Sequence, residues 1–169
     1  ITEIPLSGRF DVGPFDIELI TLTHSIPEPN ACVIRTVAGS VMHTGDWKLD
    51  PDPRVGPSTD EAALIRAGKE GILAMVCDST NALVQGSSGS EGDVREILTE
   101  KIGRFDNRVV VACFASNVAR LNSIAHAAAA HDRSVGLVGR SLWRFYEASQ
   151  ENGYLTDIPR FLSPKEAAL

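Results

Sequence analysis

The spacing of apolar residues changes near residue 60, and this change constrains the fold more than any other feature of the sequence. Before it, apolar and polar residues alternate, as in Phe15–Thr23 (FDIELITLT), and two further short segments, 31–37 and 40–44, are joined by Ala38-Gly39. Alternation with a period of two, followed by a tight turn, predicts a half-buried strand and then a hairpin. We therefore expect an antiparallel β region at the start of the chain.

Beyond residue 60, short apolar runs alternate with apolar stripes at helical spacing, which predicts βαβ units and a parallel sheet. The expected helices cover 61–69, 93–105, 117–131 and about 140–152, and Thr59-Asp60 and Ser116 are the expected caps of the first and third. The expected strands cover 71–77, 108–114 and 134–138. We expect the first to be buried and the second to be central in the sheet. The fold class is therefore α/β.

Composition and charge exclude several classes of protein. The chain has 169 residues, of which 43% are hydrophobic, so it suits about one domain and has enough apolar surface to fold. Its apolar runs are far shorter than the roughly 20 residues that cross a bilayer, and a net charge of −6 gives no general attraction for nucleic acid. The three cysteines, Cys32, Cys77 and Cys113, form no CxxC pair, which predicts buried free thiols in a reducing compartment.

Two polar residues lie just beyond the ends of predicted strands in the β region. His24 begins a loop that contains two prolines, and Asp46 follows Gly45 after the segment 40–44. Imidazole and carboxylate are common ligands of zinc and manganese, and the second oxygen of a carboxylate allows it to bridge two ions. Each residue also has a purely structural interpretation, because a histidine can hydrogen-bond its own loop and an aspartate can stabilise a turn. Their occurrence as a pair favours a metal site.

Three further candidates follow expected strands. Asp78 follows the strand 71–77, at the carboxyl end where open α/β sheets form ligand sites, although a turn or cap role explains it equally well. Ser116-Asn117 and Gly139-Arg140-Ser141 each begin an expected helix, where free backbone N–H groups can bind phosphate. An ordinary serine cap is the simpler interpretation of the first. Aromatic residues follow Arg140, and their helical spacing favours a core face over a nucleic-acid surface.

Several segments of the sequence, taken in order, resemble the ribonuclease J family: THSIPE, HTGDWKLD, CDSTNA, FASNVARL and GRSLWR. The resemblance extends from about Leu6 to Arg144, and the family belongs to the β-CASP branch of the metallo-β-lactamase superfamily. It implies part of a metallo-β-lactamase αββα sandwich, followed by part of an α/β β-CASP domain with a parallel sheet. The implied boundaries are 1–55 for the later strands of the first domain, 56–80 for a junction and 81–169 for the start of the β-CASP domain.

The resemblance also implies roles for the candidate residues. His24 matches a histidine that ligates one zinc ion, Asp46 matches an aspartate that bridges two zinc ions, and Asp78 matches an acidic residue that supports the network beside the metals. Asp46 and Asp78 are thus the expected catalytic residues. Two zinc ions are expected for each full-length subunit, and manganese would satisfy the same ligands. The candidates for an RNA-facing surface are Ser116, Asn117, Arg140 and Ser141.

The principal ligand motif of that family, HxHxDH, does not occur in this sequence. A tetrahedral zinc site needs four ligands, or three and a water, and only His24 and Asp46 of the implied set are present. We therefore expect a central segment of a longer cytoplasmic enzyme that hydrolyses RNA phosphodiester bonds, and we expect this chain alone to carry little or no metal and to be inactive. Half of a sandwich would leave an apolar sheet face uncovered, which predicts a homo-oligomer.

Two alternatives remain open. A non-catalytic RNA-binding or scaffold module with the same fold explains the missing ligand motif directly. A metallo-β-lactamase relative that hydrolyses another ester is disfavoured, because the CDSTNA and FASN segments indicate an α/β insertion that small-substrate relatives lack. The length of the natural gene product, and the presence of HxHxDH in it, would separate these alternatives.

Overall fold

The computed structural model describes residues 1–168, and the chain divides into two units. Unit 1 comprises residues 1–24, 28–51 and 57–88, and unit 2 comprises 25–27, 52–56 and the chain from Gly89 onward. Within residues 1–168, none of the helices is both long enough and apolar enough to span a bilayer. The two units are described separately below.

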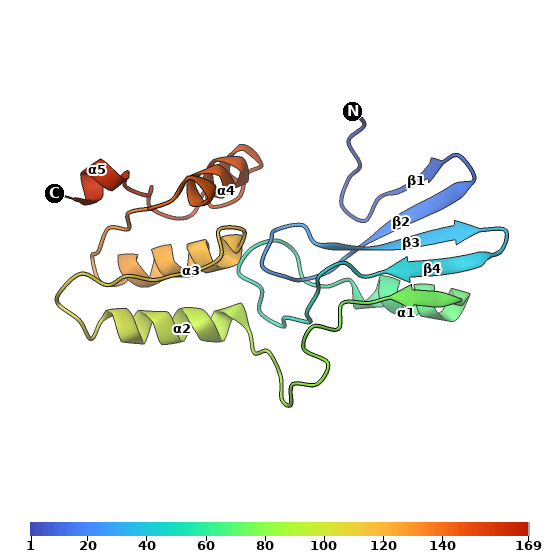
Figure 1. The fold of residues 1–169 in the computed structure, drawn as a ribbon, viewed down its shortest axis with the longest axis horizontal. Helices are drawn as coiled ribbons and strands as arrows, with labels where there is room; N and C mark the ends of the chain where they lie inside the picture. The colour runs from blue at the N-terminus through green and yellow to red at the C-terminus, as the bar shows by residue number, and fades with distance from the viewer. Residues whose placement is uncertain (169) are drawn as a thin grey trace. The chain divides into compact units, whose positions relative to one another are not determined.

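Unit 1 is built on a five-stranded sheet in which the strands lie in chain order (Figure 1). The strands are β1 (Arg9–Val12), β2 (Phe15–Thr21), β3 (Asn30–Thr36), β4 (Gly39–His43) and β5 (Ala74–Val76). The first four pair antiparallel, which confirms the predicted β region and its hairpin. β5 joins β4 in parallel after the crossover helix α1 (Glu61–Glu70). This parallel pairing confirms the α/β class.

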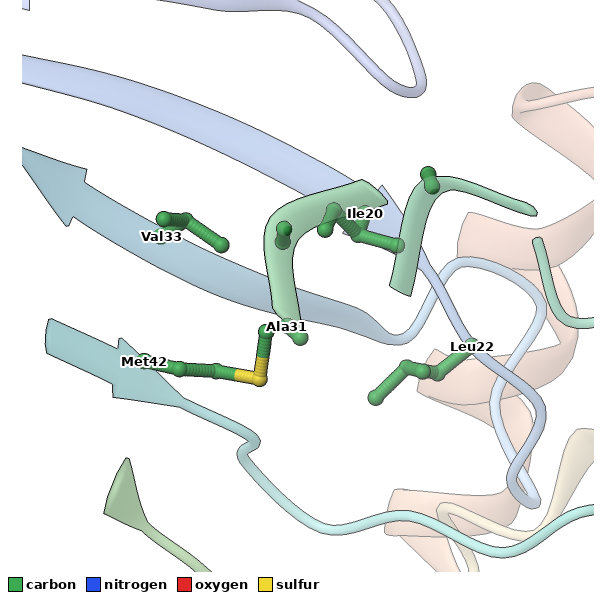
Figure 2. Close-up of a cluster of buried hydrophobic side chains, with 7 residues drawn as sticks. Ile20, Leu22, Ala31, Val33 and Met42 are labelled. Carbon is green, nitrogen blue, oxygen red and sulfur yellow. The ribbon is translucent and has the colours of Figure 1, made fainter. Parts of the chain in front are cut away.

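The core of unit 1 lies between one face of the sheet and α1 (Figure 2). Alternate residues of the strands supply it, because successive side chains of a strand point to opposite faces. Asp60 caps α1 as predicted, since its carboxylate accepts a hydrogen bond from the Ala63 backbone N–H at 2.9 Å. The buried side chains of this core are Ile20, Leu22, Ala31, Val33, Met42, Ala63 and Ala67.

A buried carboxylate also joins the sheet to α1. Glu18 in β2 is only 7% exposed. Its two oxygens accept hydrogen bonds from Arg35 of β3 and Arg66 of α1, both at 2.6 Å. Arg35 also donates to Glu70 at the end of α1, at 2.7 Å. Two guanidinium groups compensate the cost of removing this carboxylate from water. Replacing Glu18 by a residue that cannot bond both arginines should therefore destabilise unit 1.

The opposite face of the sheet is apolar and only partly covered. The register places Ile17 beside Ile34 and Val41, and Leu19 beside Cys32. These side chains are half-buried in the chain by itself. The uncovered apolar face that the sequence predicts is therefore present, and the homo-oligomer inferred from it stays a prediction.

Unit 2 contains α2 (Glu91–Ile102), α3 (Val118–Ala129), α4 (Arg140–Glu151) and the short α5 (Pro164–Ala167). α3 is the most buried of them and carries much of the core. Tyr146 of α4 packs edge-to-face against Phe161, with ring centroids 4.8 Å apart. The buried residues of this core are Val118, Leu121, Ala125, Leu137, Tyr146, Leu155 and Phe161.

The two strands predicted in unit 2 are not formed within the described residues. Residues 108–114 alternate between half-buried and exposed side chains, as a strand does, but they join no ladder, and the segment 134–138 makes a single bridge, from Gly136 to Leu162. Both segments line a largely apolar cavity of about 820 Å³ together with residues of α3. The prediction of a central strand was wrong for a physical reason: alternation determines which side chains face inward, but a ladder also needs neighbouring strands to pair with.

Four smaller expectations also need correction. The buried strand predicted over 71–77 is reduced to β5, which lies exposed at the edge of the sheet. The three cysteines are free, but they are half-buried rather than buried. α2 begins two residues earlier than predicted, because Ser90 and Asp93 form a capping box. Asn117 rather than Ser116 caps α3, because its side-chain oxygen accepts the Arg120 backbone N–H at 2.8 Å.

Replacing Glu18 by Gln should lower the free energy of unfolding by about 3 kcal/mol, because two guanidinium groups lose their buried counter-charge. Asp16→Asn is the matched control, since the Asp16–Arg9 pair is largely exposed and should contribute far less to the free energy of unfolding. Urea unfolding followed by circular dichroism measures both. Equal effects of the two substitutions would show that the Glu18 network does not stabilise unit 1.

Glu166 in α5 provides a test of pH dependence. Hydrogen bonds from the Arg160 guanidinium, and then from Ser163, lower the pKa of Glu166 from 4.5 to about 2. Because the folded-state pKa is depressed, this stabilisation is fully present above pH 4.5 and is lost as the pH falls towards 2. Arg160→Gln should raise the pKa of Glu166 towards 4.5, as measured by an NMR titration of its carboxyl carbon. An unchanged pKa in this variant would contradict the assigned cause.

Candidate functional site

Thr23 joins the loop of His24 to the loop of Asp46 in unit 1. It is 2% exposed and forms an antiparallel bridge with Lys48. Lys48 N–H donates to the Thr23 carbonyl at 2.9 Å, and the Thr23 hydroxyl donates to the Lys48 carbonyl at 2.5 Å. The Asp50 N–H in turn donates to the Thr23 hydroxyl oxygen at 3.0 Å. The chain just before His24 is therefore fixed to the chain just after Asp46.

The turn that presents Asp46 depends on glycine. Gly45 has φ +60°, a left-handed conformation that residues with a Cβ adopt only with strain. Its N–H donates to Nδ1 of His43 at 3.0 Å, which closes the turn at the end of β4. The side chain of Asp46 is exposed beyond this turn. The turn therefore presents the carboxylate to solvent, where it can reach a ligand.

Asp78 is bound to this same turn. Thr44 extends the parallel pairing of β4 and β5, since its N–H donates to the Val76 carbonyl at 3.0 Å, and its hydroxyl oxygen accepts the Asp78 N–H at 3.1 Å. The backbone N–H of Trp47, the residue after Asp46, also lowers the pKa of the Asp78 carboxyl. Asp78 thus lies beside the Asp46 turn because β5 pairs with β4.

Hydrogen bonding keeps Asp78 ionised. The Thr80 hydroxyl donates to its Oδ1 at 2.5 Å, and the Thr80 backbone N–H donates to the same oxygen at 2.9 Å. These bonds lower the pKa of Asp78 below its usual value, and the charge of His24 lowers it further. The influence of His24 on this pKa and the hydrogen bond from Asp78 to Thr44 associate Asp78 with the loops of both other candidate residues in unit 1.

The chain does not contain a complete metal site within its described residues. Among residues 1–168, no group of three or more His, Cys, Asp or Glu side chains is arranged to hold a metal ion. A zinc ion in a protein needs at least three ligands and a water. The side chains of His24, Asp46 and Asp78 therefore do not fit a metal by themselves.

The Ser116-Asn117 turn lies at the beginning of α3 in unit 2. Asn117 closes the turn, because its N–H donates to the Phe114 carbonyl at 3.0 Å, while Ser116 is exposed. One residue of α3 also reaches another segment, since the Ala119 N–H donates to the carbonyl of Ser25 at 3.2 Å. Ser25 directly follows His24 in the chain.

The second predicted RNA-facing turn begins α4. Arg140 and Ser141 are both exposed, and no side chain at the N-cap position, Gly139, satisfies the first turn of the helix. The two turns follow the extended segments 108–113 and 134–138, which line the same cavity. Both turns therefore present polar groups to solvent.

Sequence reasoning missed two residues that position the candidate site. An aspartate at the end of a strand commonly accepts a hydrogen bond from the backbone N–H two residues later, as Asp78 does from Thr80. The contact with Thr80 could therefore have been predicted from the sequence. Thr44 had none, because its contact with Asp78 exists only once β5 has paired with β4. Contacts of this second kind follow from topology rather than from local sequence.

Comparisons with known proteins find similarity to ribonuclease J over most of the chain. Residues 106–168 match the family model of the ribonuclease J β-CASP domain. The chain is 46% identical to Ribonuclease J of Sinorhizobium meliloti, over 98% of this chain and 30% of that protein. It is 45% identical to Ribonuclease J of Corynebacterium glutamicum, over 92% of this chain and 22% of that protein. It is 41% identical to Ribonuclease J of Thermus thermophilus, over 98% of this chain and 29% of that protein.

A solved structure shows a similar fold. The chain aligns with the crystal structure of a protein of unknown function from Enterococcus faecalis V583 with a TM-score of 0.63 and 14% identity. The alignment covers 98% of this chain and 41% of that one. The chain spans less than a third of the length of the three curated relatives described above. In sequence, then, this chain is ribonuclease J-like over nearly its whole length, and its C-terminal part matches the β-CASP domain of that family.

Proposed function

We propose that this chain is the central segment of a metal-dependent ribonuclease that hydrolyses RNA phosphodiester bonds. The observation that carries the proposal is the connection of three strand ends in unit 1. The loops of His24 and Asp46 are joined through Thr23 and Lys48, and the Asp78 N–H donates to the hydroxyl oxygen of Thr44, two residues before Asp46. The imidazole of His24 and the carboxylate of Asp46 are donor types suited to zinc or manganese, and they supply two of the ligands that such a site needs. The names of the curated relatives support RNA as the substrate.

In this proposal His24 and Asp46 are two of the metal ligands, and Asp78 is the ionised group that orients them. The remaining ligands come from parts of the protein outside this segment, because residues 1–168 hold no complete set. Two metal ions bind each full-length subunit, in the cytoplasm, and zinc is the metal with manganese as the alternative. This chain by itself is then inactive.

Unit 2 contributes the proposed RNA-facing groups. The first turn of α3 presents Ser116 and Asn117, and the first turn of α4 presents Arg140 and Ser141. Hydroxyl groups, backbone N–H groups and a guanidinium are the donors that proteins direct at phosphates. A net charge of −6 means that such contacts are local rather than part of a broadly basic surface.

A second candidate function is a non-catalytic RNA-binding or scaffold module. The incomplete metal-ligand set of the described residues is the observation that favours it. A module of this kind would bind RNA through the same two turns, and its RNA affinity would not change when Asp46 is replaced. The next experiment therefore separates the two candidates.

Asp46→Ala in the full-length protein should lower metal content and reduce RNA cleavage by at least about 100-fold, because a metal ligand is removed. Elemental analysis and the cleavage rate of an end-labelled RNA measure these effects. Asp11→Ala is the control, since Asp11 is an exposed aspartate of β1 and should leave both values unchanged. Cleavage at the normal rate by the Asp46 variant would refute the metal assignment and favour the module.

Arg140→Gln should weaken RNA binding at all sequences and lower the salt dependence by about one unit in the slope of log Kd against log salt concentration. Lys101→Gln is the control, because it removes an equal charge from the last turn of α2. Fluorescence anisotropy with a labelled single-stranded RNA measures both variants. Equal slopes for the wild type and the Arg140 variant would remove this arginine from the RNA-facing surface.

A further inference from the structure

α2 and α3 lie side by side in parallel, with their N-termini adjacent (Figure 1). The contacts between them follow the same order along both helices. Glu91 bonds Arg120 near the two N-termini, Arg95 bonds Asn122 one turn further, and His131 bonds the Thr99 carbonyl near the C-terminal ends, at 2.8 Å. Two parallel helices place two positively polarised ends together, which favours a negative charge at that point.

Glu91 supplies this negative charge from inside the protein. It lies in the first turn of α2 and is 6% exposed. Its carboxylate accepts two hydrogen bonds from the Arg120 guanidinium, from Nε at 2.9 Å and from Nη2 at 3.2 Å. Such a two-point bond fixes orientation as well as distance, which a single bond does not.

Glu91 does not serve the cap of its own helix. Ser90 and Asp93 form the capping box of α2, so the end of this helix is satisfied without the Glu91 carboxylate. The backbone there is held tightly, since the Ser90 hydroxyl donates to the Asp52 carbonyl at 3.1 Å. A Cβ at Gly92 would lie 2.1 Å from the Asp52 carboxylate. The carboxylate of Glu91 therefore projects from a fixed support towards α3.

Arg120 transmits this constraint to the turn before α3. Its backbone N–H donates a hydrogen bond to Oδ1 of Asn117 at 2.8 Å. The side chain of Arg120 is thus held by Glu91 while its backbone holds the Ser116-Asn117 turn. Holding one residue at both ends fixes the direction in which this turn presents its donors.

We propose that Glu91 is a positioning residue, which acts through Arg120 to hold the Ser116-Asn117 turn in the conformation that binds an RNA phosphate. The inference rests on the proposed function, in which this turn faces RNA. Glu91 itself does not touch RNA in this account. Its loss should weaken substrate binding without changing the chemical step.

The test uses steady-state kinetics of the full-length protein on a single-stranded RNA. Glu91→Gln keeps the size of the side chain and removes its charge, and it should raise KM about 10-fold while kcat and metal content stay within about twofold. Arg120→Lys keeps the positive charge but loses the two-point bond, and it should raise KM similarly. The double variant Glu91→Gln with Arg120→Lys should raise KM no more than either single change, because both act on one interaction.

Glu18→Gln is the matched control, since Glu18 is also a buried carboxylate that bonds arginine, and it lies in unit 1. It should lower the urea midpoint as Glu91→Gln does, and it should leave KM unchanged. Equal increases of KM in the two variants would show a general effect of stability and would overturn the proposal. Should Glu91→Gln fail to fold, Arg120→Lys gives the same comparison.

Ser116→Ala separates this inference from the proposed function. If Ser116→Ala raises KM and Glu91→Gln does not, Glu91 has only a structural role, and the RNA-facing turn is retained. If neither change raises KM, the turn does not bind RNA, and both the inference and that part of the proposed function are overturned. An increase of KM in both variants, with the control unchanged, supports the positioning role.

Discussion

The candidate site of unit 1 depends on one buried threonine. The Thr23 hydroxyl donates a hydrogen bond to Lys48 and accepts one from Asp50. It also lies 3.0 Å from the hydroxyl of Thr59, just before α1. Three segments far apart in the sequence therefore meet at one side chain. A buried hydroxyl is costly unless it is bonded, so each partner of Thr23 stabilises the positions of the others. The placement of His24 and Asp46 therefore depends on the hydrogen bonds of Thr23.

Local sequence predicted those parts of the fold that need no distant partner. The alternation in β2, the hairpin of β3 and β4, and the helix capped by Asp60 all depend on neighbours in the chain. The segment 108–114 shows the limit of such patterns. Its side chains alternate as expected, but a ladder depends on a second strand, and the pattern carries no information about whether that strand is present.

The same distinction applies to the site. His24, Asp46 and Asp78 were predicted from their places after strands, and the structure connects their loops through backbone and threonine bonds. Thr44 and Glu91 had no local signal. Thr44 acquires its role from the pairing of β4 with β5, and Glu91 acquires its role from the parallel packing of α2 and α3. Buried polar contacts between distant segments are specified by topology, which a single sequence shows only indirectly.

The extended segment 108–114 has a consequence for the chain as an isolated polypeptide. Val110 and Phe114 are 86% and 85% exposed, and no ladder within residues 1–168 occupies the backbone groups between them. A β-branched stretch with unpaired backbone groups is a template on which another extended chain can add. Arg108 at its start supplies the only charge in the run RVVVACF. In the isolated chain this segment is therefore an unprotected edge, which favours association with a second extended chain.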